Sequence, residues 1–120
     1  MPELPEVETV CRSLRPHLLG RRIEAVDVRE RRLRVPVDIL RVERLAGKRI
    51  ESVDRVAKYI LLRLTGASVW LFHLGMSGKL ICAANNTPRQ KHDHIVVDLD
   101  DGAQLRYHDP RRFGLAIVSH

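Results

Sequence analysis

The stretch KYILLRLTGASVWLFH, residues 58–73, decides the fold class. It holds the segment 58–65 and most of the segment 69–74, both short and rich in Val, Ile and Leu, with the turn signal Thr65-Gly66 between them. Segments of the same kind lie further out along the chain, at 22–29, 49–55, 79–83, 93–99, 103–108 and 113–118. Eight short strands in one domain predict an antiparallel sandwich or barrel with flanking helices.

The start of the chain is expected to be helical. Apolar residues recur there at spacings of three and four, and they are Leu4, Val7, Cys11, Leu14 and Leu18. Pro5 fits a first helical turn and Gly20 fits a C-terminal stop, so the pattern predicts a helix over 4–18. A second, shorter helix is expected around 38–46.

The composition indicates one domain with a basic surface. The chain has 120 residues, and 44% of them are apolar, which is enough to fill a core. The 21 Lys and Arg residues outnumber the 15 acids, which gives a net charge of +6. Such an excess favours a polyanionic partner, because each neutralised phosphate releases counterions.

Several other classes of protein fit poorly. Cys11 and Cys82 form no CxxC pair, so we expect reduced, buried thiols in a cytosolic protein rather than a zinc ribbon. The first residues lack the apolar region of a signal peptide, and every apolar run is far shorter than the roughly 20 residues of a membrane helix. The polar segment 84–92 is expected to be an exposed, mobile loop.

Met1-Pro2 can place a nucleophile at the start of the chain. Removal of Met1 would leave Pro2 with an α-amine, which titrates near ~7.7–8.0 against ~10.4 for Lys. Such an amine can attack a sugar C1′ and form an iminium, with Glu3 beside it as proton donor or acceptor. Taken alone, Met-Pro is more often only a chain start before a helix.

Two glycine-bounded stretches have features of a DNA wedge. In Asp109-Pro-Arg-Arg-Phe-Gly114, a predicted turn carries two arginines beside Phe113, although Phe113 in the core is an equal alternative. In His73-Leu-Gly-Met-Ser-Gly78, a tight loop presents Met76 at its tip, although the residues alone favour a Met76 that folds back into the core.

Other charged groups have a plain structural interpretation. Lys58, at the start of an apolar strand, would ordinarily be solvated. His92-Asp93-His94 is better explained by phosphate or backbone contacts than by a metal, because two further ligands are lacking. The arginines between 29 and 34 are most simply a solvated basic face, with long-range attraction of DNA as the alternative.

Five stretches together resemble the formamidopyrimidine-DNA glycosylase family, and they span nearly the whole chain in the family's order. They are Pro2-Glu-Leu-Pro-Glu-Val-Glu-Thr9, Ala57-Lys-Tyr59, His73-Leu-Gly-Met-Ser-Gly78, Lys91-His-Asp-His94 and Tyr107-His-Asp-Pro-Arg-Arg-Phe-Gly114. The resemblance implies a mainly β fold with flanking helices: an antiparallel β-sandwich of about eight strands, with an N-terminal α-helix that carries the nucleophile.

The resemblance also implies the catalytic group. Pro2 would attack C1′ of the damaged nucleotide, and Glu3 would be the general acid/base near the sugar ring oxygen. Glu6 would support the site. Lys58 and His73 would hold the phosphates on either side of the everted nucleotide.

A second group would contact the rest of the DNA. Met76, Arg111 and Phe113 would fill the gap left by the everted base, with Arg111 reading the estranged cytosine. Arg112 would hold backbone phosphate, helped by His92. Leu4 and these wedge residues favour the branch that acts on oxidised purines over the endonuclease VIII branch, which prefers oxidised pyrimidines.

The implied function is excision of 8-oxoguanine opposite cytosine and of formamidopyrimidines, followed by β,δ-elimination, with no redox cofactor. We expect residues 1–120 to be the N-terminal catalytic domain, expressed as a fragment or from a truncated gene. The family's helix–two-turn–helix and zinc-finger domains, and the zinc itself, are absent from it. Damaged double-stranded DNA in the bacterial cytoplasm, at the nucleoid, is the expected partner, with no membrane and no obligate protein partner.

Two other functions remain open at this point. The charge of +6 and the missing domains are also compatible with a non-catalytic DNA-binding module. A structural domain with an incidentally basic surface is the third interpretation.

Overall fold

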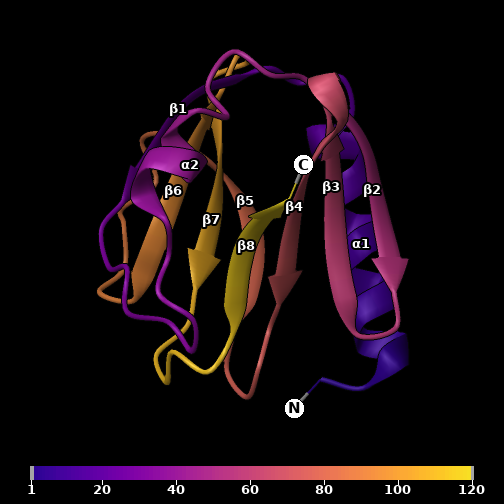
Figure 1. Cartoon of the computed structure of the whole chain (residues 1–120), viewed down its shortest axis with the longest axis vertical. Helices are drawn as coiled ribbons and strands as arrows, with labels where there is room; N and C mark the ends of the chain where they lie inside the picture. Colours follow the sequence, from indigo (N-terminus) through magenta and orange to yellow (C-terminus); the bar gives the residue numbers. More distant parts are fainter. Residues whose placement is uncertain (1, 120) are drawn as a thin grey trace.

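The computed structural model describes residues 2–119 and shows two antiparallel sheets of four strands each (Figure 1). One sheet contains β1 (Ile23–Val28), β6 (Asp93–Leu99), β7 (Ala103–His108) and β5 (Lys79–Ala84), in that order. The other contains β2 (Ile50–Val56), β3 (Tyr59–Leu64), β4 (Ser68–His73) and β8 (Leu115–Ser119). The predicted sandwich of about eight strands is therefore confirmed.

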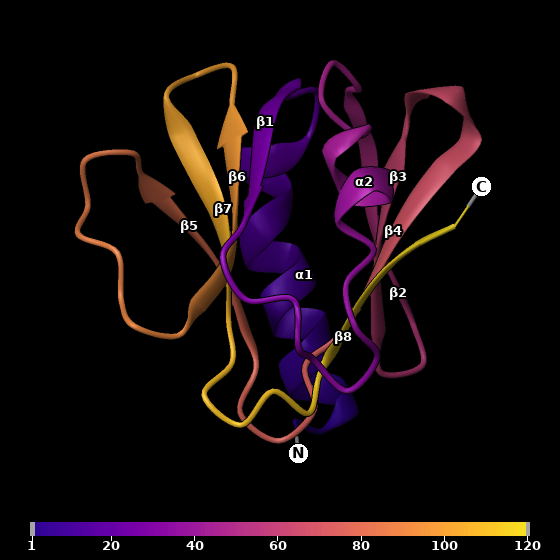
Figure 2. The same cartoon turned by 60° about the vertical axis from the view of Figure 1, so that its left-hand side comes forward.

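The N-terminal helix α1 (Leu4–Leu18) has the predicted bounds. Figure 2 shows it lying between the two sheets, where four residues of its apolar stripe are buried: Val7, Cys11, Leu14 and Leu18. Leu4, the first member of the stripe, is 44% exposed. The first turn of α1 lies past the ends of the strands, where no sheet covers it (Figure 1).

The second helix, α2 (Ile39–Glu43), is shorter than the predicted 38–46. Asp38 caps its start, because the Asp38 side chain accepts a hydrogen bond from the Arg41 backbone N–H at 3.2 Å. The helix ends early because the N–H groups of Leu45 and Ala46 bond to carbonyls three residues back, at 3.0 and 3.2 Å, which forms tight turns instead of another helical turn.

The strands agree with prediction to within two residues at each end. The largest difference is at β8, which starts at Leu115 rather than at 113, because residues 109–114 form a tight turn outside the sheet. The segment 84–92 is mostly exposed, as predicted, and buried Arg106 anchors its backbone. The Arg106 guanidinium donates to the carbonyl oxygens of Thr87 at 2.7 Å and Pro88 at 3.3 Å.

The core lies between the sheets and α1. The Phe72 ring, on β4, lies 5.9 Å from the Tyr107 ring, on β7, so this aromatic pair joins one sheet to the other. Along the lower edge of Figures 1 and 2, the N-terminal end of α1 lies near the loop that follows β4 and the turn that precedes β8. Segments far apart in the sequence therefore gather at one edge of the sandwich. No helix of residues 2–119 is long and apolar enough to cross a membrane.

Truncation of Leu14, which is 2% exposed, should destabilise the fold, because the cavity left under α1 cannot collapse fully. We expect Leu14→Ala to lower the free energy of unfolding by about 2–5 kcal/mol, measured by urea denaturation. Leu40→Ala is the matched control, since Leu40 is 68% exposed, and its effect should stay within about 0.5 kcal/mol. Equal losses in the two variants would contradict this packing.

Candidate functional site

Pro2 lies at the rim of a cavity of about 530 Å³. We call it the Pro2 cavity, and its other lining residues come from α1 and from the chain between β4 and β5: Glu6, Val10, Ser13, Leu74, Met76, Ser77, Gly78, Lys79, Leu80 and Ile81. The first residue that the structure describes thus faces the loop that carries Met76. A group bound in this cavity would therefore contact Pro2.

Glu3 and Lys58, far apart in the sequence, form an ion pair. The Lys58 Nζ lies 3.7 Å from the Glu3 Oε2, and Lys58 directly follows Ala57, whose φ of 51° makes the tight turn between β2 and β3. The Glu3 N–H donates to the Glu6 Oε1 at 3.4 Å, so Glu6 holds the start of α1. The structure therefore brings Pro2, Glu3, Glu6 and Lys58 together at one end of α1.

His73, at the end of β4, is buried and held in one orientation. Its Nδ1 accepts a hydrogen bond from the Gly75 N–H at 3.0 Å, so the neutral ring carries its proton on Nε2. Burial lowers the pKa of His73 below its usual 6.5, and the charges of Arg34 and Lys58 lower it further. The side chain can thus offer one N–H donor to a phosphate oxygen near neutral pH.

The loop after β4 exposes Met76, contrary to what the residues alone favour. Met76 is 51% exposed, and the loop is held against the turn before β8. A Cβ on Gly75 would lie 2.7 Å from the Phe113 backbone carbon, and one on Gly78 would meet the Leu74 carbonyl. Because only glycine allows these approaches, Met76 points outward rather than into the core.

The turn before β8 depends on the buried carboxylate of Asp109. Its Oδ2 accepts from the Tyr107 hydroxyl at 2.7 Å and from the Gly114 N–H at 3.0 Å. Its Oδ1 accepts from the Ser77 hydroxyl at 2.7 Å, and the Ser77 oxygen in turn accepts from the Arg111 N–H at 3.1 Å. These bonds join the Met76 loop to the turn, and burial together with the carboxylate raises the pKa of Tyr107 well above its usual value.

The same turn exposes the other predicted wedge residues. Phe113 is 51% exposed, so the alternative of a core phenylalanine is excluded, and Arg111 and Arg112 are exposed beside it. Arg112 has a φ of 59°, which turns the chain sharply between its two neighbours. Met76, Arg111 and Phe113 therefore project from two loops that are bonded to each other.

The His92–His94 stretch makes structural contacts. The His94 Nε2 lies 2.6 Å from the Asp109 carbonyl oxygen, and the Asp93 Oδ1 lies 2.9 Å from the His108 Nδ1. Half-buried His92 accepts at its carbonyl oxygen from the Asp109 N–H at 3.1 Å. Within residues 2–119 no group of three or more His, Cys, Asp or Glu side chains is placed to hold a metal ion.

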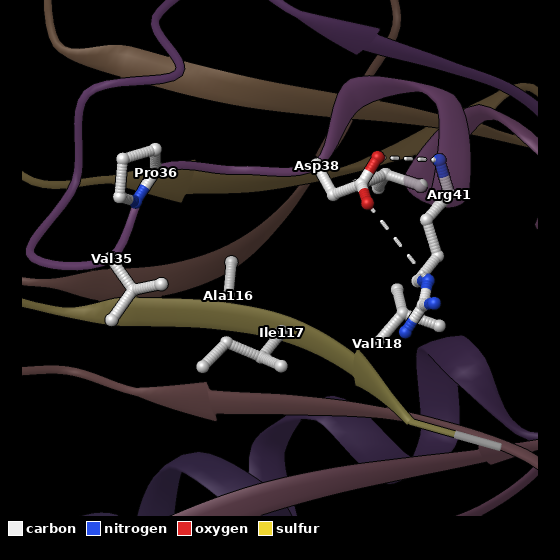
Figure 3. Close-up of a pocket in the computed structure, with 8 residues that line it drawn as sticks. Val35, Pro36, Asp38, Arg41, Ala116, Ile117 and Val118 are labelled. Carbon is white, nitrogen blue, oxygen red and sulfur yellow. Dashed lines mark hydrogen bonds and ion pairs between the residues drawn. The ribbon is translucent and has the colours of Figure 1, made fainter.

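Two important residues were missed by sequence reasoning. Asp109 was interpreted only as part of a turn, and Ser77 only as part of a glycine loop, because their hydrogen bonds join segments about 30 residues apart that only the fold brings together. A separate hollow of about 140 Å³, mostly aliphatic, lies between α2 and β8 (Figure 3). None of the predicted site residues lines it.

Loss of the Ser77 hydroxyl should loosen both loops. Ser77→Ala removes one partner from the buried Asp109 carboxylate and one from the Arg111 N–H, so we expect a loss of about 1–3 kcal/mol in the free energy of unfolding by urea. Ser13→Ala is the control, because exposed Ser13 bonds only within α1. A Ser77→Ala effect no larger than that of the control would contradict the coupling.

The lowered pKa of His73 predicts a pH dependence of stability. As pH falls below 6.5, the unfolded chain takes up a proton that the folded histidine resists, so the stabilising contribution is present above 6.5 and lost below it. In urea denaturation between pH 7 and pH 5, His73→Gln should lose less stability than the unaltered chain. The exposed-residue control His17→Gln should keep the original pH dependence, and parallel curves for all three proteins would argue against the assignment.

Comparison with known proteins places this geometry in a family. The family model described as "Formamidopyrimidine-DNA glycosylase N-terminal domain" matches residues 1–116. The formamidopyrimidine-DNA glycosylase of Laribacter hongkongensis is 56% identical over 121 residues, and that of Dichelobacter nodosus is 50% identical; each match covers 100% of this chain and 44% of the relative. The chain thus spans less than half the length of these curated relatives.

Solved structures agree with the sequence matches. The Lactococcus lactis formamidopyrimidine-DNA glycosylase, non-covalently bound to DNA containing an AP site, superposes with a TM-score of 0.89 at 33% identity, over 98% of this chain and 44% of that one. The same enzyme with DNA containing FAPY-dG gives a TM-score of 0.88 at 33% identity, over 97% and 43%. The chain belongs to the formamidopyrimidine-DNA glycosylase family, of which it contains the N-terminal domain.

Proposed function

We propose that this chain supplies the nucleophile and the DNA wedge of a bifunctional glycosylase and AP lyase that removes oxidised purines. One observation carries the proposal: Pro2, at the rim of its cavity, lies at the same edge of the sandwich as the ion-paired Glu3 and Lys58 and the exposed Met76. That arrangement joins an amine, a proton carrier, a cation and an apolar plug, which are the groups that attack at C1′ of an everted nucleotide requires.

The first chemical step replaces the glycosidic bond. With Met1 removed, the neutral Pro2 nitrogen attacks C1′, and the damaged base leaves with the electron pair of the glycosidic bond. The proton that the attacking nitrogen then loses is taken up by the departing base, which leaves the nitrogen with a free lone pair. Protonation of the sugar ring oxygen by Glu3 then allows the C1′–O4′ bond to break, and the nitrogen lone pair forms an iminium at C1′. Met1 itself lies outside the described residues.

The iminium makes strand cleavage feasible. It acidifies the C2′ proton, so loss of that proton to a base expels the 3′ phosphate, and a second elimination expels the 5′ phosphate. Lys58 and His73 would hold these phosphates, Lys58 by charge and His73 through its Nε2–H. The steps need no redox cofactor.

The wedge residues would keep the nucleotide everted. Eversion costs a few kcal/mol in lost pairing and stacking, and Met76, Arg111 and Phe113 offset part of that cost by filling the gap. Arg111 would bond to the estranged cytosine. Arg112 would hold backbone phosphate, with help from His92.

The proposed substrates and cellular location are inferred from the relatives. Their name, and the FAPY-dG and AP-site DNA in the neighbouring structures, support ring-opened purines in DNA as substrates. The proposal extends to 8-oxoguanine opposite cytosine in double-stranded DNA. We place the activity in the bacterial cytoplasm, at the nucleoid, without an obligate protein partner. The zinc of the family would belong to a part of the whole protein outside these 120 residues, and no step here depends on it.

Trapping on abasic DNA tests the nucleophile. Sodium borohydride, added to the chain with a duplex bearing one abasic site opposite cytosine, should reduce the iminium to a stable adduct that mass spectrometry maps to Pro2. The control has one Ala inserted before Pro2, which converts the Pro2 amine into an amide and should abolish any adduct on Pro2, although the new Ala amine can still react. An adduct on a lysine of the unaltered chain, or one that still maps to Pro2 in the control, would refute the assignment to Pro2.

The same experiment separates the second candidate function. The charge of +6 also fits a non-catalytic DNA-binding module. Saturable, salt-sensitive DNA binding without any adduct, in protein whose mass shows that Met1 is absent, would favour that module.

A further inference from the structure

A second, polar hollow of about 440 Å³ lies beside the turn that carries Arg112. We call it the basic pocket, and its lining residues come from three separate segments: Arg29, Glu30, Arg32, Lys91, His92, Asp93, His94, Pro110 and Arg112. It shares no residue with the Pro2 cavity. The segment after β1 comes down beside the turn before β8, where the Arg34 N–H donates to the Gly114 carbonyl oxygen at 3.3 Å (Figure 1).

Both acids of the basic pocket are already paired. The Glu30 Oε1 accepts from the Arg32 Nη2 at 2.6 Å and lies 3.5 Å from the Arg112 Nη1. The Asp93 carboxylate is held by His108 at 2.9 Å and by the Gln90 N–H at 2.8 Å. Neither carboxylate is therefore left to repel an incoming anion without compensation.

Two cations of the pocket keep their full hydrogen-bonding capacity. Among residues 2–119, the side chains of Arg29 and Lys91 make no hydrogen bond or ion pair, and both residues are exposed. The Glu30 carboxylate meanwhile draws Arg32 and Arg112 to one side of the pocket. This arrangement presents several donors with positive charge to a single polar space, which suits an oxyanion such as phosphate.

The residues around the basic pocket indicate which DNA phosphate it would bind. Arg112 lines the basic pocket and lies between Arg111 and Phe113, so an anion bound in the pocket would lie beside the proposed wedge. Lys58 pairs instead with Glu3, next to Pro2, and neither Lys58 nor His73 lines the basic pocket. Its only aromatic lining residues are half-buried His92 and buried His94, so the basic pocket offers little surface on which to stack a base.

We propose that the basic pocket binds a phosphodiester of the DNA strand opposite the one that Pro2 attacks, with Arg29 and Lys91 as its phosphate-binding side chains. Glu30 is a positioning residue that holds Arg32 and Arg112 beside them. The proposal rests on the proposed function, because it takes the DNA duplex as the ligand and Pro2 as the marker of the attacked strand.

Salt dependence of binding tests the contacts. Each neutralised phosphate contributes about 0.9 to the slope of log affinity against log salt, so Arg29→Gln with Lys91→Gln, which together lose one phosphate, should lower its magnitude by about 0.9 on an abasic duplex. The matched control, Arg12→Gln with Arg44→Gln, removes two exposed cations outside the pocket and should leave the slope nearly unchanged. An unchanged slope in the pocket variant, or an equal drop in the control, would overturn the proposal.

Uncharged linkages in the DNA backbone test which strand the basic pocket binds. Methylphosphonates placed one at a time in the strand opposite the abasic site should, at one position, erase the difference between the pocket variant and the unaltered chain. If only linkages in the abasic strand do so, the strand assignment is wrong. Failure of the unaltered chain both to bind this duplex and to form the borohydride adduct would instead contradict the proposed function.

Discussion

The loop after β4 and the turn before β8 are held together by the buried carboxylate of Asp109. It accepts hydrogen bonds from a core tyrosine, from the backbone of its own turn and from a serine on the neighbouring loop. A buried carboxylate is stable only when donors surround it, so the two loops can hardly separate without leaving it unpaired. The apolar and cationic side chains of the proposed wedge are consequently carried on one bonded unit, so the DNA contact proposed for exposed Met76 and Phe113 would need little further cost in conformational entropy.

Most of the fold could be predicted because its signals are local. The spacing of apolar residues predicted both ends of α1 correctly, and short apolar segments separated by turn signals predicted all eight strands. The errors fall where the local pattern of apolar residues does not determine where a helix or strand ends. The apolar spacing of 38–46 continues through tight turns that lack helical hydrogen bonds. The start of β8 is delayed because the Gly114 N–H donates to the Asp109 carboxylate instead of to a neighbouring strand.

The candidate site was predicted in a different way. From the residues alone, Met1-Pro2 was an ordinary chain start and Met76 was expected inside; the family resemblance singled out Pro2, Glu3 and the wedge. The comparisons establish that family, while the individual roles remain proposals that the geometry supports. Asp109 and Ser77 could not have been found by pattern, because a hydrogen bond across 32 positions has no periodicity to reveal it.

Tyr107 contacts both the core and the turn that carries Arg111 and Phe113. Its ring packs against Phe72 across the sandwich, and its hydroxyl bonds to Asp109. Any redesign that shifts the spacing of the two sheets would therefore move the wedge as well, even if every surface residue were kept. Interior substitutions that shift the sheets should thus alter the proposed DNA contacts without touching the DNA, and homologues with differently filled interiors should not exchange their wedge loops freely.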